Sequence, residues 1–202
     1  MPAGDELPVD ERRFTLETIA SMVRVCTSCR LHLNRTHAVP GEGSPTAALV
    51  LVGEAPGRAE DRTGQPFQGM AGRHLDDVLT DVGVARDDVF ITSINKCRPP
   101  RNRPPLRDER DACRVLLDAQ LATVRPPVLL AMGRIAAWSL VPGVNTKLTL
   151  DRLRSDSPYA VERGELFVTC HPAAALRFPA QRPGFAADVR AACEAAGLVD
   201  AR

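Results

Sequence analysis

Apolar residues along this chain follow two different spacings. The continuous apolar run at 47–52 is typical of a strand that is buried on both faces of a sheet, and residues 89–94 and 128–132 are predicted to be the second and third strands. Elsewhere apolar residues recur every three or four positions, as on one face of a helix. This spacing predicts helices from Leu16 to about Cys26, over 75–82 with a stop at Gly83, over 108–124, from Gly133 through Trp138, and over 186–196.

The end of the chain predicts a hairpin. Residues 159–162 and 166–170 flank a turn at Gly164, and the second of these strands leads to His171. Strands that alternate with helices need crossover connections, so neighbouring strands run parallel. The expected fold is an α/β domain with three layers, α/β/α, around a central, mostly parallel sheet.

The composition fits one folded domain. Of the 202 residues, 44% are hydrophobic and 25% are charged, which argues against disorder and fibrous repeats. We expect a single domain over 1–202 with a flexible tail at 1–12. No apolar run is long enough to span a bilayer, and the N-terminus has no signal-peptide pattern, so we expect a cytoplasmic protein without membrane contact. The net charge of +1 means that a polyanionic partner needs a local basic patch.

The residues that follow the predicted strands are candidates for a ligand site, because open α/β sheets bind ligands beyond the carboxyl ends of their strands. Glu54 follows the first strand, in a glycine-rich segment that continues to Phe67. The glycine spacing matches neither a dinucleotide-binding nor a Walker motif, so no nucleotide cofactor is expected. His171 follows the last strand and opens a predicted loop of small residues at 173–175. We expect Glu54, Phe67 and His171 to line one cleft.

A cationic loop follows the second predicted strand. Residues 96–110 include six basic residues, two acidic residues and four prolines, which make the segment stiff as well as positively charged. Such a loop suits phosphate binding, and a solvated surface loop is the alternative.

Four of the six cysteines are candidates for metal ligands. Cys26 and Cys29 form a C-x-x-C pair, Cys97 lies in the cationic loop, and Cys113 lies 16 positions further on in the next predicted helix. Disulfides are rare in the cytoplasm, so this set suits zinc or a cubane iron–sulfur cluster. Buried free thiols are the alternative. The other two cysteines fall in apolar strand and helix surroundings and are expected to be core residues.

Four segments together resemble a known family. With the four cysteines in register, they resemble the family 4 uracil-DNA glycosylases, which are bacterial and archaeal repair enzymes with an iron–sulfur cluster. The resemblance runs from about Cys26 to Arg177, most of the chain. The four segments are Gly53-Glu54-Ala55-Pro56-Gly57, Thr63-Gly64-Gln65-Pro66-Phe67, Lys96-Cys97-Arg98-Pro99-Pro100 with Asn102-Arg103, and His171-Pro172 with Leu176-Arg177.

The resemblance implies an enzyme that flips uracil out of single- or double-stranded DNA and hydrolyses its N-glycosidic bond, leaving an abasic site for base excision repair. It implies a structural 4Fe-4S cluster, DNA as the partner, and a monomer, since one copy suffices. The implied residues are Glu54 and His171 for catalysis, Ala55, Phe67, Ser93 and Asn95 around uracil, Arg98, Arg101, Arg103, Leu176 and Arg177 on DNA, and Cys26, Cys29, Cys97 and Cys113 on the cluster.

Each catalytic residue has an implied role. His171 would stabilise the negative charge that develops on O2 of the departing uracil. Glu54 would position the attacking water and offset positive charge on the sugar. Family 1 enzymes have an aspartate where this chain has Ala55, and family 4 members generally have Ala or Gly there, so Glu54 either acts as a base or only positions the water. Leu176 is the expected wedge in the minor groove, with ordinary packing as the alternative.

One position departs from the family pattern. Family 4 usually has an asparagine in the second strand that reads uracil, and this chain has Ser93 there. Asn95 lies two residues later and either substitutes from the same strand face or is a turn residue that ends the strand. Without the amide, discrimination against cytosine should weaken.

Two other functions are compatible with the sequence. Ser93 suggests a catalytically altered relative that keeps the fold and the cluster and binds DNA without turnover. A zinc-stapled α/β protein whose basic loop contacts RNA or protein is the second. Relatives that trap the abasic sugar do so through a histidine in a basic insertion, and residues 96–110 contain no histidine, which disfavours that variant.

Overall fold

The computed structural model describes residues 15–162 and 164–200, so the tail expected at 1–12 lies outside it. The helices are α1 (Leu16–Val25), α2 (Arg58–Thr63), α3 (Met70–Val82), α4 (Arg107–Val124), α5 (Arg134–Leu140), α6 (Leu150–Ser155), α7 (Pro172–Arg177) and α8 (Arg182–Ala195). The strands are β1 (Glu42–Gly43), β2 (Leu49–Gly53), β3 (Phe90–Ser93), β4 (Val128–Met132), β5 (Tyr159–Val161) and β6 (Gly164–Thr169). The predicted strands and helices are present, with ends shifted by a few residues. None of the described helices is both long and apolar enough to cross a bilayer.

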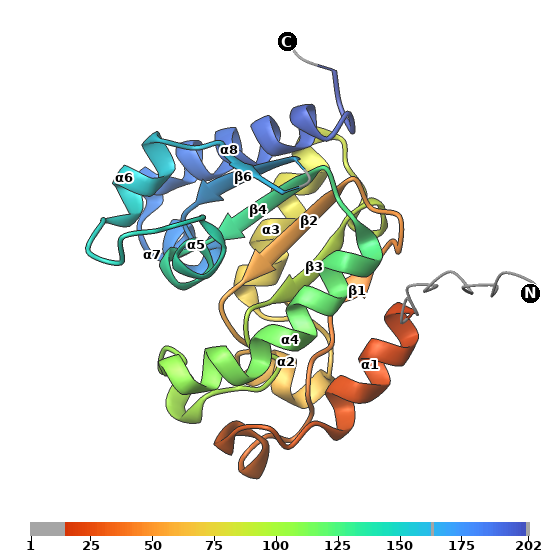
Figure 1. The fold of residues 1–202 in the computed structure, drawn as a ribbon. Helices are drawn as coiled ribbons and strands as arrows, with labels where there is room; N and C mark the ends of the chain where they lie inside the picture. Colours follow the sequence, from red (N-terminus) through yellow and green to blue (C-terminus); the bar gives the residue numbers. More distant parts are fainter. Residues whose placement is uncertain (1–14, 163, 201–202) are drawn as a thin grey trace, which may run out of the picture.

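Within these residues, six strands form one sheet in the order β1-β3-β2-β4-β6-β5 (Figure 1). The four inner strands are parallel neighbours, and the edge strands β1 and β5 pair antiparallel. In the register, Leu51 of β2 lies between Ile91 of β3 and Leu130 of β4. All residues of these three strands are buried, as expected for parallel strands covered on both faces. The predicted mostly parallel sheet is confirmed.

Alternate residues of each inner strand enter two different cores, because successive side chains point to opposite faces of a sheet. Leu49 and Leu51 pack in the core that contains α3 and α8, whereas Val50 and Val52 pack in the core that contains α4 and α5. Helices therefore cover both faces of the sheet (Figure 1). The three-layer α/β/α arrangement predicted from the apolar runs is confirmed.

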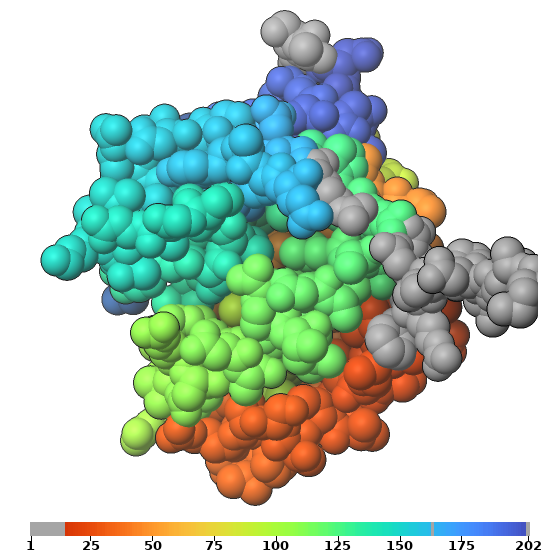
Figure 2. Space-filling view, viewed as in Figure 1, coloured from red at the N-terminus to blue at the C-terminus, as the bar shows by residue number. Residues whose placement is uncertain are grey.

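A third, smaller core joins the first helix to α4. It contains Ile19 and Val23 of α1, Leu116 of α4, and the cysteines Cys97 and Cys113. In the space-filling view, the orange segment that follows α1 lies against the green α4 and the loop before it (Figure 2). This core lies beside the sheet rather than between its layers, and it brings the N-terminal segment to the loop after β3.

The segment after His171 is a helix, so the loop expected at 173–175 is wrong. α7 begins at Pro172, a residue that is favoured at the first helical position, and continues through three alanines, which have the highest helix propensity. A helix of six residues is too short to show an apolar period, which is the signal that predicts longer helices. The sequence analysis missed α2, α6 and β1 for the same reason: they are short.

Candidate active site and cysteine centre

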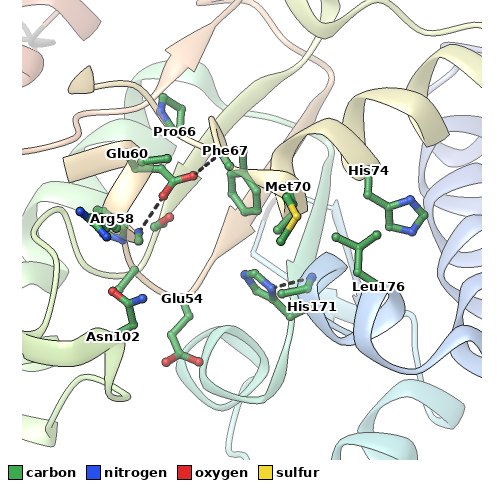
Figure 3. Close-up of a pocket in the computed structure, with 18 of the residues that line it drawn as sticks. Glu54, Arg58, Glu60, Pro66, Phe67, Met70, His74, Asn102, His171 and Leu176 are labelled. Carbon is green, nitrogen blue, oxygen red and sulfur yellow. Dashed lines mark hydrogen bonds between the residues drawn. The ribbon is translucent and has the colours of Figure 1, made fainter. Parts of the chain in front are cut away.

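A cavity of about 1110 Å³ opens beyond the carboxyl ends of the parallel strands. Glu54 follows β2, His171 follows β6, and Phe67 comes from the loop between α2 and α3; all three line this cavity (Figure 3). Their expected convergence on one cleft is therefore confirmed. The wall also includes Ala55, Glu60, Ser93, Asn102, Arg103, Leu176 and Arg177.

Phe67 reaches the cavity from a strained backbone position. Its φ of 52° lies in the left-handed region, which costs a non-glycine residue about 1–2 kcal/mol. Two glycines make room for it: a Cβ on Gly53 would lie 2.6 Å from Phe67 Cζ, and one on Gly72 would lie 1.6 Å from the Phe67 carbonyl oxygen. The Phe67 ring stacks on that of His171, with centroids 5.8 Å apart. The two rings thus form adjoining parts of one wall.

His171 is held in one orientation by the helix that it caps. It is the N-cap of α7, and its Nδ1 accepts a hydrogen bond from the Ala173 backbone N–H at 3.2 Å. An accepting Nδ1 assigns the proton of the neutral ring to Nε2. Burial lowers the pKa of His171 to about 4, and the negative charge of Glu60 opposes this only in part. At neutral pH the imidazole is therefore an uncharged ring whose Nε2–H can donate to a ligand.

Glu54 presents a carboxylate without a protein partner. Among the described residues, its side chain makes no hydrogen bond or ion pair, and Figure 3 shows it extending from the end of β2. Burial raises the pKa of Glu54, while the positive charges of Arg134 and Arg110 act in the opposite direction. A carboxylate that is half-buried and has free acceptor sites can bind and orient a water molecule.

Glu60 ties together the two loops that form one side of the cavity. Its carboxylate accepts hydrogen bonds from the backbone N–H groups of Gly57 (3.0 Å), Gln68 (2.8 Å) and Gly69 (2.9 Å) (Figure 3). The first belongs to the loop after β2, and the other two follow Phe67. The sequence analysis gave Glu60 no role, although a glutamate three residues after a helix N-cap is the spacing of a capping box.

Ser93 lines the cavity, but Asn95 does not. β3 ends at Ser93, so the two-residue alternation of a strand does not continue to Asn95. The Asn95 side chain is buried and donates from Nδ2 to the Glu109 carbonyl oxygen at 2.9 Å, while its backbone N–H donates to the Glu54 carbonyl oxygen at 3.1 Å. The structure therefore places Asn95 beneath the loop that carries Glu54, rather than among the groups facing a ligand.

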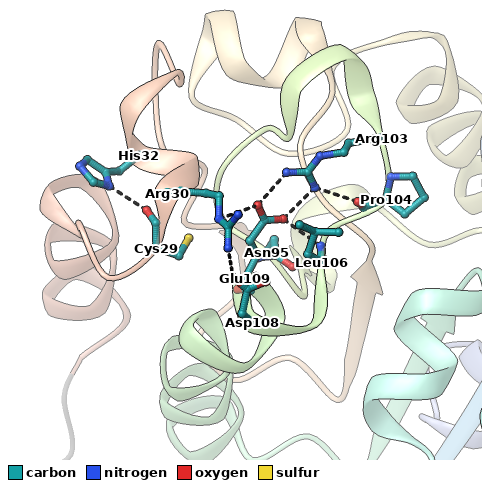
Figure 4. Close-up of polar contacts among 9 residues, drawn as sticks. All are labelled: Cys29, Arg30, His32, Asn95, Arg103, Pro104, Leu106, Asp108 and Glu109. Atoms are coloured by element: carbon teal, nitrogen blue, oxygen red, sulfur yellow. Dashed lines mark hydrogen bonds and ion pairs between the residues drawn. The ribbon is translucent and has the colours of Figure 1, made fainter.

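The five residues predicted to contact DNA fall into two groups. Arg103, Leu176 and Arg177 line the cavity, whereas Arg98 and Arg101 lie on the adjoining loop outside it. The Arg103 guanidinium is already paired: it donates to both carboxylate oxygens of the buried Glu109, at 2.8 and 2.7 Å (Figure 4). The hydrogen bonds from the Arg103 guanidinium and from the Leu106 backbone N–H lower the pKa of Glu109. This pairing fixes the cationic loop against α4.

Arg58, Arg73 and Asn102 are among the cavity residues that were not predicted as site residues. Arg58 and Arg73 add positive charge to the wall, and Asn102 enters it from the cationic loop. The Asn102 Oδ1 accepts from Arg98 Nε at 2.6 Å, which leaves its amide N–H groups for the cavity. Asn102 stood inside a motif that carried the family resemblance, and that was the signal available for it.

The four predicted metal ligands gather around a second, small cavity. Cys26 caps the end of α1, Cys29 precedes a short 3₁₀ helix, Cys97 follows β3, and Cys113 lies in α4; all four line it. None of the chain's six cysteines, all of which are described, is in a disulfide. Cys170 and Cys193 lie instead in the core on the α8 face, as expected.

The donor set fits an iron–sulfur cluster. Four cysteine sulfurs lining one small cavity are the donor set that a cubane cluster takes, and zinc takes the same set. Two donors face them: Arg35 Nη1 lies 3.1 Å from Cys97 Sγ, and the Lys96 backbone N–H lies 3.3 Å from Cys113 Sγ. Hydrogen bonds to sulfur are typical of cluster sites, where they tune the ligands.

Comparisons with known proteins agree with this geometry. The model of the uracil DNA glycosylase superfamily matches residues 40–194. The type-4 uracil-DNA glycosylase of Thermotoga maritima is 40% identical over 166 residues, which cover 82% of this chain and 85% of that protein. Those of Pyrobaculum aerophilum (40% over 178 residues, 86% and 91% covered) and Archaeoglobus fulgidus (38% over 187 residues, 91% and 94% covered) are similar along nearly their whole length. The chain therefore belongs to the uracil-DNA glycosylase superfamily, and within it to the type-4 family.

Proposed function

We propose that this protein is a uracil-DNA glycosylase that removes uracil from DNA and leaves an abasic site. The observation that carries the proposal is the convergence of Glu54, Phe67 and His171 on one cavity, in a chain whose relatives are named type-4 uracil-DNA glycosylases. The glycosidic bond of a stacked nucleotide is out of reach, so the nucleotide must rotate out of the helix into this cavity.

His171 and Phe67 act on the base. The Phe67 ring provides an apolar face on which uracil can stack. When the C1′–N1 bond breaks, its electron pair leaves with uracil as an anion, and the Nε2–H of His171 donates to the oxygen that gains this charge. Because the ring is neutral and already oriented by Ala173, this donor needs no reorganisation during the reaction. Such a donor contributes about 2.7–4 kcal/mol to lowering the barrier in comparable sites.

Glu54 acts on the water. Its carboxylate has free acceptor sites at the end of β2, where it can hold the water that adds to C1′ and offset positive charge on the sugar. Because burial raises the pKa of Glu54, its carboxylate is a better acceptor for the water's proton than an exposed glutamate would be. We propose that it positions the water and that a proton can pass to it.

Cys26, Cys29, Cys97 and Cys113 would hold a 4Fe-4S cluster. A cluster there supplies structural cross-linking rather than chemistry at the glycosidic bond. The residues that carry it, from α1, the cationic loop and α4, would be joined at one point, which stiffens the arginine-bearing loop beside the cavity. Iron and acid-labile sulfide analysis of anaerobically purified protein tests this; a colourless protein with one equivalent of zinc contradicts it.

The partner is uracil-containing DNA. Arg58, Arg73 and Arg177 at the cavity would meet phosphates, and Leu176 would contact the gap that the flipped nucleotide leaves. We propose a monomer, because the catalytic and cluster residues all come from a single copy. We also propose a cytoplasmic location, where cysteine ligands stay reduced.

Uracil release from labelled single- and double-stranded oligonucleotides tests the function. Wild-type protein should release uracil, and Glu54→Gln and His171→Ala should lose turnover but keep binding to the same DNA; Glu17→Gln, exposed on α1, is the matched control. No release by cluster-loaded wild type overturns the proposal. Binding to uracil-containing DNA without release would favour a non-catalytic relative, the alternative that Ser93 suggests, and Ser93→Asn would then be expected to restore turnover.

A further inference from the structure

Lys96 is a buried cation between the two sites. It follows β3 directly before Cys97, and only 1% of its surface is exposed. Its ammonium donates to Thr92 Oγ1 at 2.6 Å, Gln120 Oε1 at 2.6 Å and the Ser93 carbonyl oxygen at 2.8 Å. All three donor positions are therefore satisfied, and all three acceptors are neutral.

In the described part of the chain, no carboxylate pairs with the Lys96 ammonium. The residue contacts a cysteine instead, because its backbone N–H lies 3.3 Å from Cys113 Sγ. An isolated buried charge is strongly unfavourable, whereas one near a compensating charge is tolerated. The position of Lys96 is thus explained if a negatively charged group occupies the cysteine cavity, which Lys96 itself lines.

The same residue also forms hydrogen bonds with two residues of the active-site cavity. Ser93 and Val39 both line that cavity. The Lys96 ammonium donates to the Ser93 carbonyl oxygen, and the Lys96 carbonyl oxygen accepts a hydrogen bond from the Val39 backbone N–H at 2.8 Å. On its other side, the Lys96 backbone N–H lies 3.3 Å from Cys113 Sγ. One residue therefore holds the floor of the active site and a predicted cluster ligand together.

We propose that Lys96 is the buried counter-charge of the iron–sulfur cluster and the positioning residue that connects the cluster to the floor of the uracil cavity. This inference rests on the cluster in the proposed function. Four thiolates give such a cluster net negative charge, and a fixed cation beside it stabilises its most negative, reduced form. A lysine that only filled space would leave the cluster's potential and lifetime unchanged when it is replaced by a neutral side chain.

The test compares wild type with variants that replace each of the chain's two lysines by a neutral residue. Lys96→Met removes the charge and keeps a flexible side chain of similar length. Lys147→Met, exposed and outside both cavities, is the matched control. Thr92→Val removes one neutral acceptor and keeps the charge, so it separates the charge from the hydrogen-bond network. Lys96→Gln is a second neutral variant that can still donate to Ser93, in case the methionine variant does not fold.

Two readouts concern the cluster alone. In a redox titration followed by electron paramagnetic resonance, Lys96→Met and Lys96→Gln should have a more negative reduction potential than wild type, Lys147→Met and Thr92→Val. Bleaching of the visible absorbance in the presence of a chelator should be about 10- to 100-fold faster in the two neutral variants, the effect expected for loss of a partner next to the ligands. Potential and bleaching rate both equal to those of Lys147→Met would overturn the proposal.

A third readout concerns the connection to the active site. The inhibition constant of free uracil, measured on cluster-loaded protein, should rise in Lys96→Met and rise less in Lys96→Gln, which keeps the bond to Ser93. If the wild type releases no uracil, the proposed function fails, and the potential and bleaching measurements still decide the role of Lys96. A wild type that binds zinc and no iron overturns both the cluster and this role.

Discussion

Glu60→Gln offers a sharp test of how the active site is built. The variant keeps the size of the side chain and removes its charge. The wild-type carboxylate holds three backbone N–H groups at 2.8–3.0 Å, one in the loop after β2 and two in the loop after Phe67. A glutamine offers one oxygen, so its NH₂ group must face at least one N–H that loses its acceptor.

The size of the effect follows from these contacts. A hydrogen bond to a charged group contributes about 1.5–3 kcal/mol, and the lower part of this range suits a half-buried carboxylate. The two bonds next to Phe67 also help to hold its left-handed backbone, which is unfavourable by itself. If this energy is lost from the positioning of Phe67 and the loop after β2, kcat/KM should fall about 10- to 100-fold.

Asp61→Asn is the matched control for this experiment. Asp61 is the next residue on α2, and its carboxylate also accepts two hydrogen bonds, from the N–H (2.8 Å) and Oγ1 (3.0 Å) of Thr36, away from the cavity. Steady-state uracil release, inhibition by free uracil and thermal unfolding should be measured for both variants. Glu60→Gln should weaken uracil inhibition at least tenfold, and Asp61→Asn should change mainly the unfolding temperature. Equal effects of the two variants on uracil inhibition would refute the reasoning.

Three further predictions follow from the same geometry. Burial lowers the pKa of His171 to about 4 from an ordinary 6.5, so the imidazole stays neutral as the pH falls from about 8 to 6. Protonation of His171 should therefore not change kcat in this range, and an NMR titration of His171 with a midpoint near 6.5 would contradict this. Since Arg103 lowers the pKa of Glu109 below 4.5, their pair stabilises the fold above that pH and ceases to do so as the pH falls through the lowered value; Glu109→Gln should lower the urea midpoint at pH 7, and a difference that persists undiminished at pH 3 would contradict this assignment. Gly72→Ala places a methyl group 1.6 Å from the Phe67 carbonyl oxygen, so it should weaken inhibition by free uracil at least tenfold, and unchanged inhibition would show that this loop can move at no cost.

Sequence patterns and structure agree most closely where a residue's place depends on its nearest neighbours along the chain. The residue pattern predicted β2, β3 and β4. Because Glu54 and His171 each follow a predicted strand, both were expected at the same edge of the sheet, where the structure has them. The four cysteines that the family resemblance implied as ligands also line one cavity, although they come from distant segments. A strand and the residue that follows it are set by residues adjacent in the chain, so a single sequence is enough to predict them.

The errors arise where the outcome depends on contacts between distant segments or on elements too short to show a pattern. α7 replaced a predicted loop, and Asn95 turned out to bind the backbone of Glu109 on α4 instead of facing the cavity. The pairing of Arg103 with Glu109 was not predicted either, although Arg103 lines the cavity. A six-residue helix is too short to show a period, and the partners of Asn95 and Arg103 depend on how the chain folds, so no residue spacing predicts them.

For this protein, the sequence alone determined the layered α/β fold, the ends of the strands at which ligands bind, and the family. These depend on the period of apolar residues and on short motifs whose members are neighbours along the chain. Only the tertiary structure decided that Glu60 binds two loops and that Lys96 lies between the two cavities. It also decided that Arg103 is paired with Glu109, whereas Glu54 has no hydrogen-bond partner among the described residues. Those facts are set by which side chains meet when layers pack, and the free energy of each buried charge depends on its partners in space.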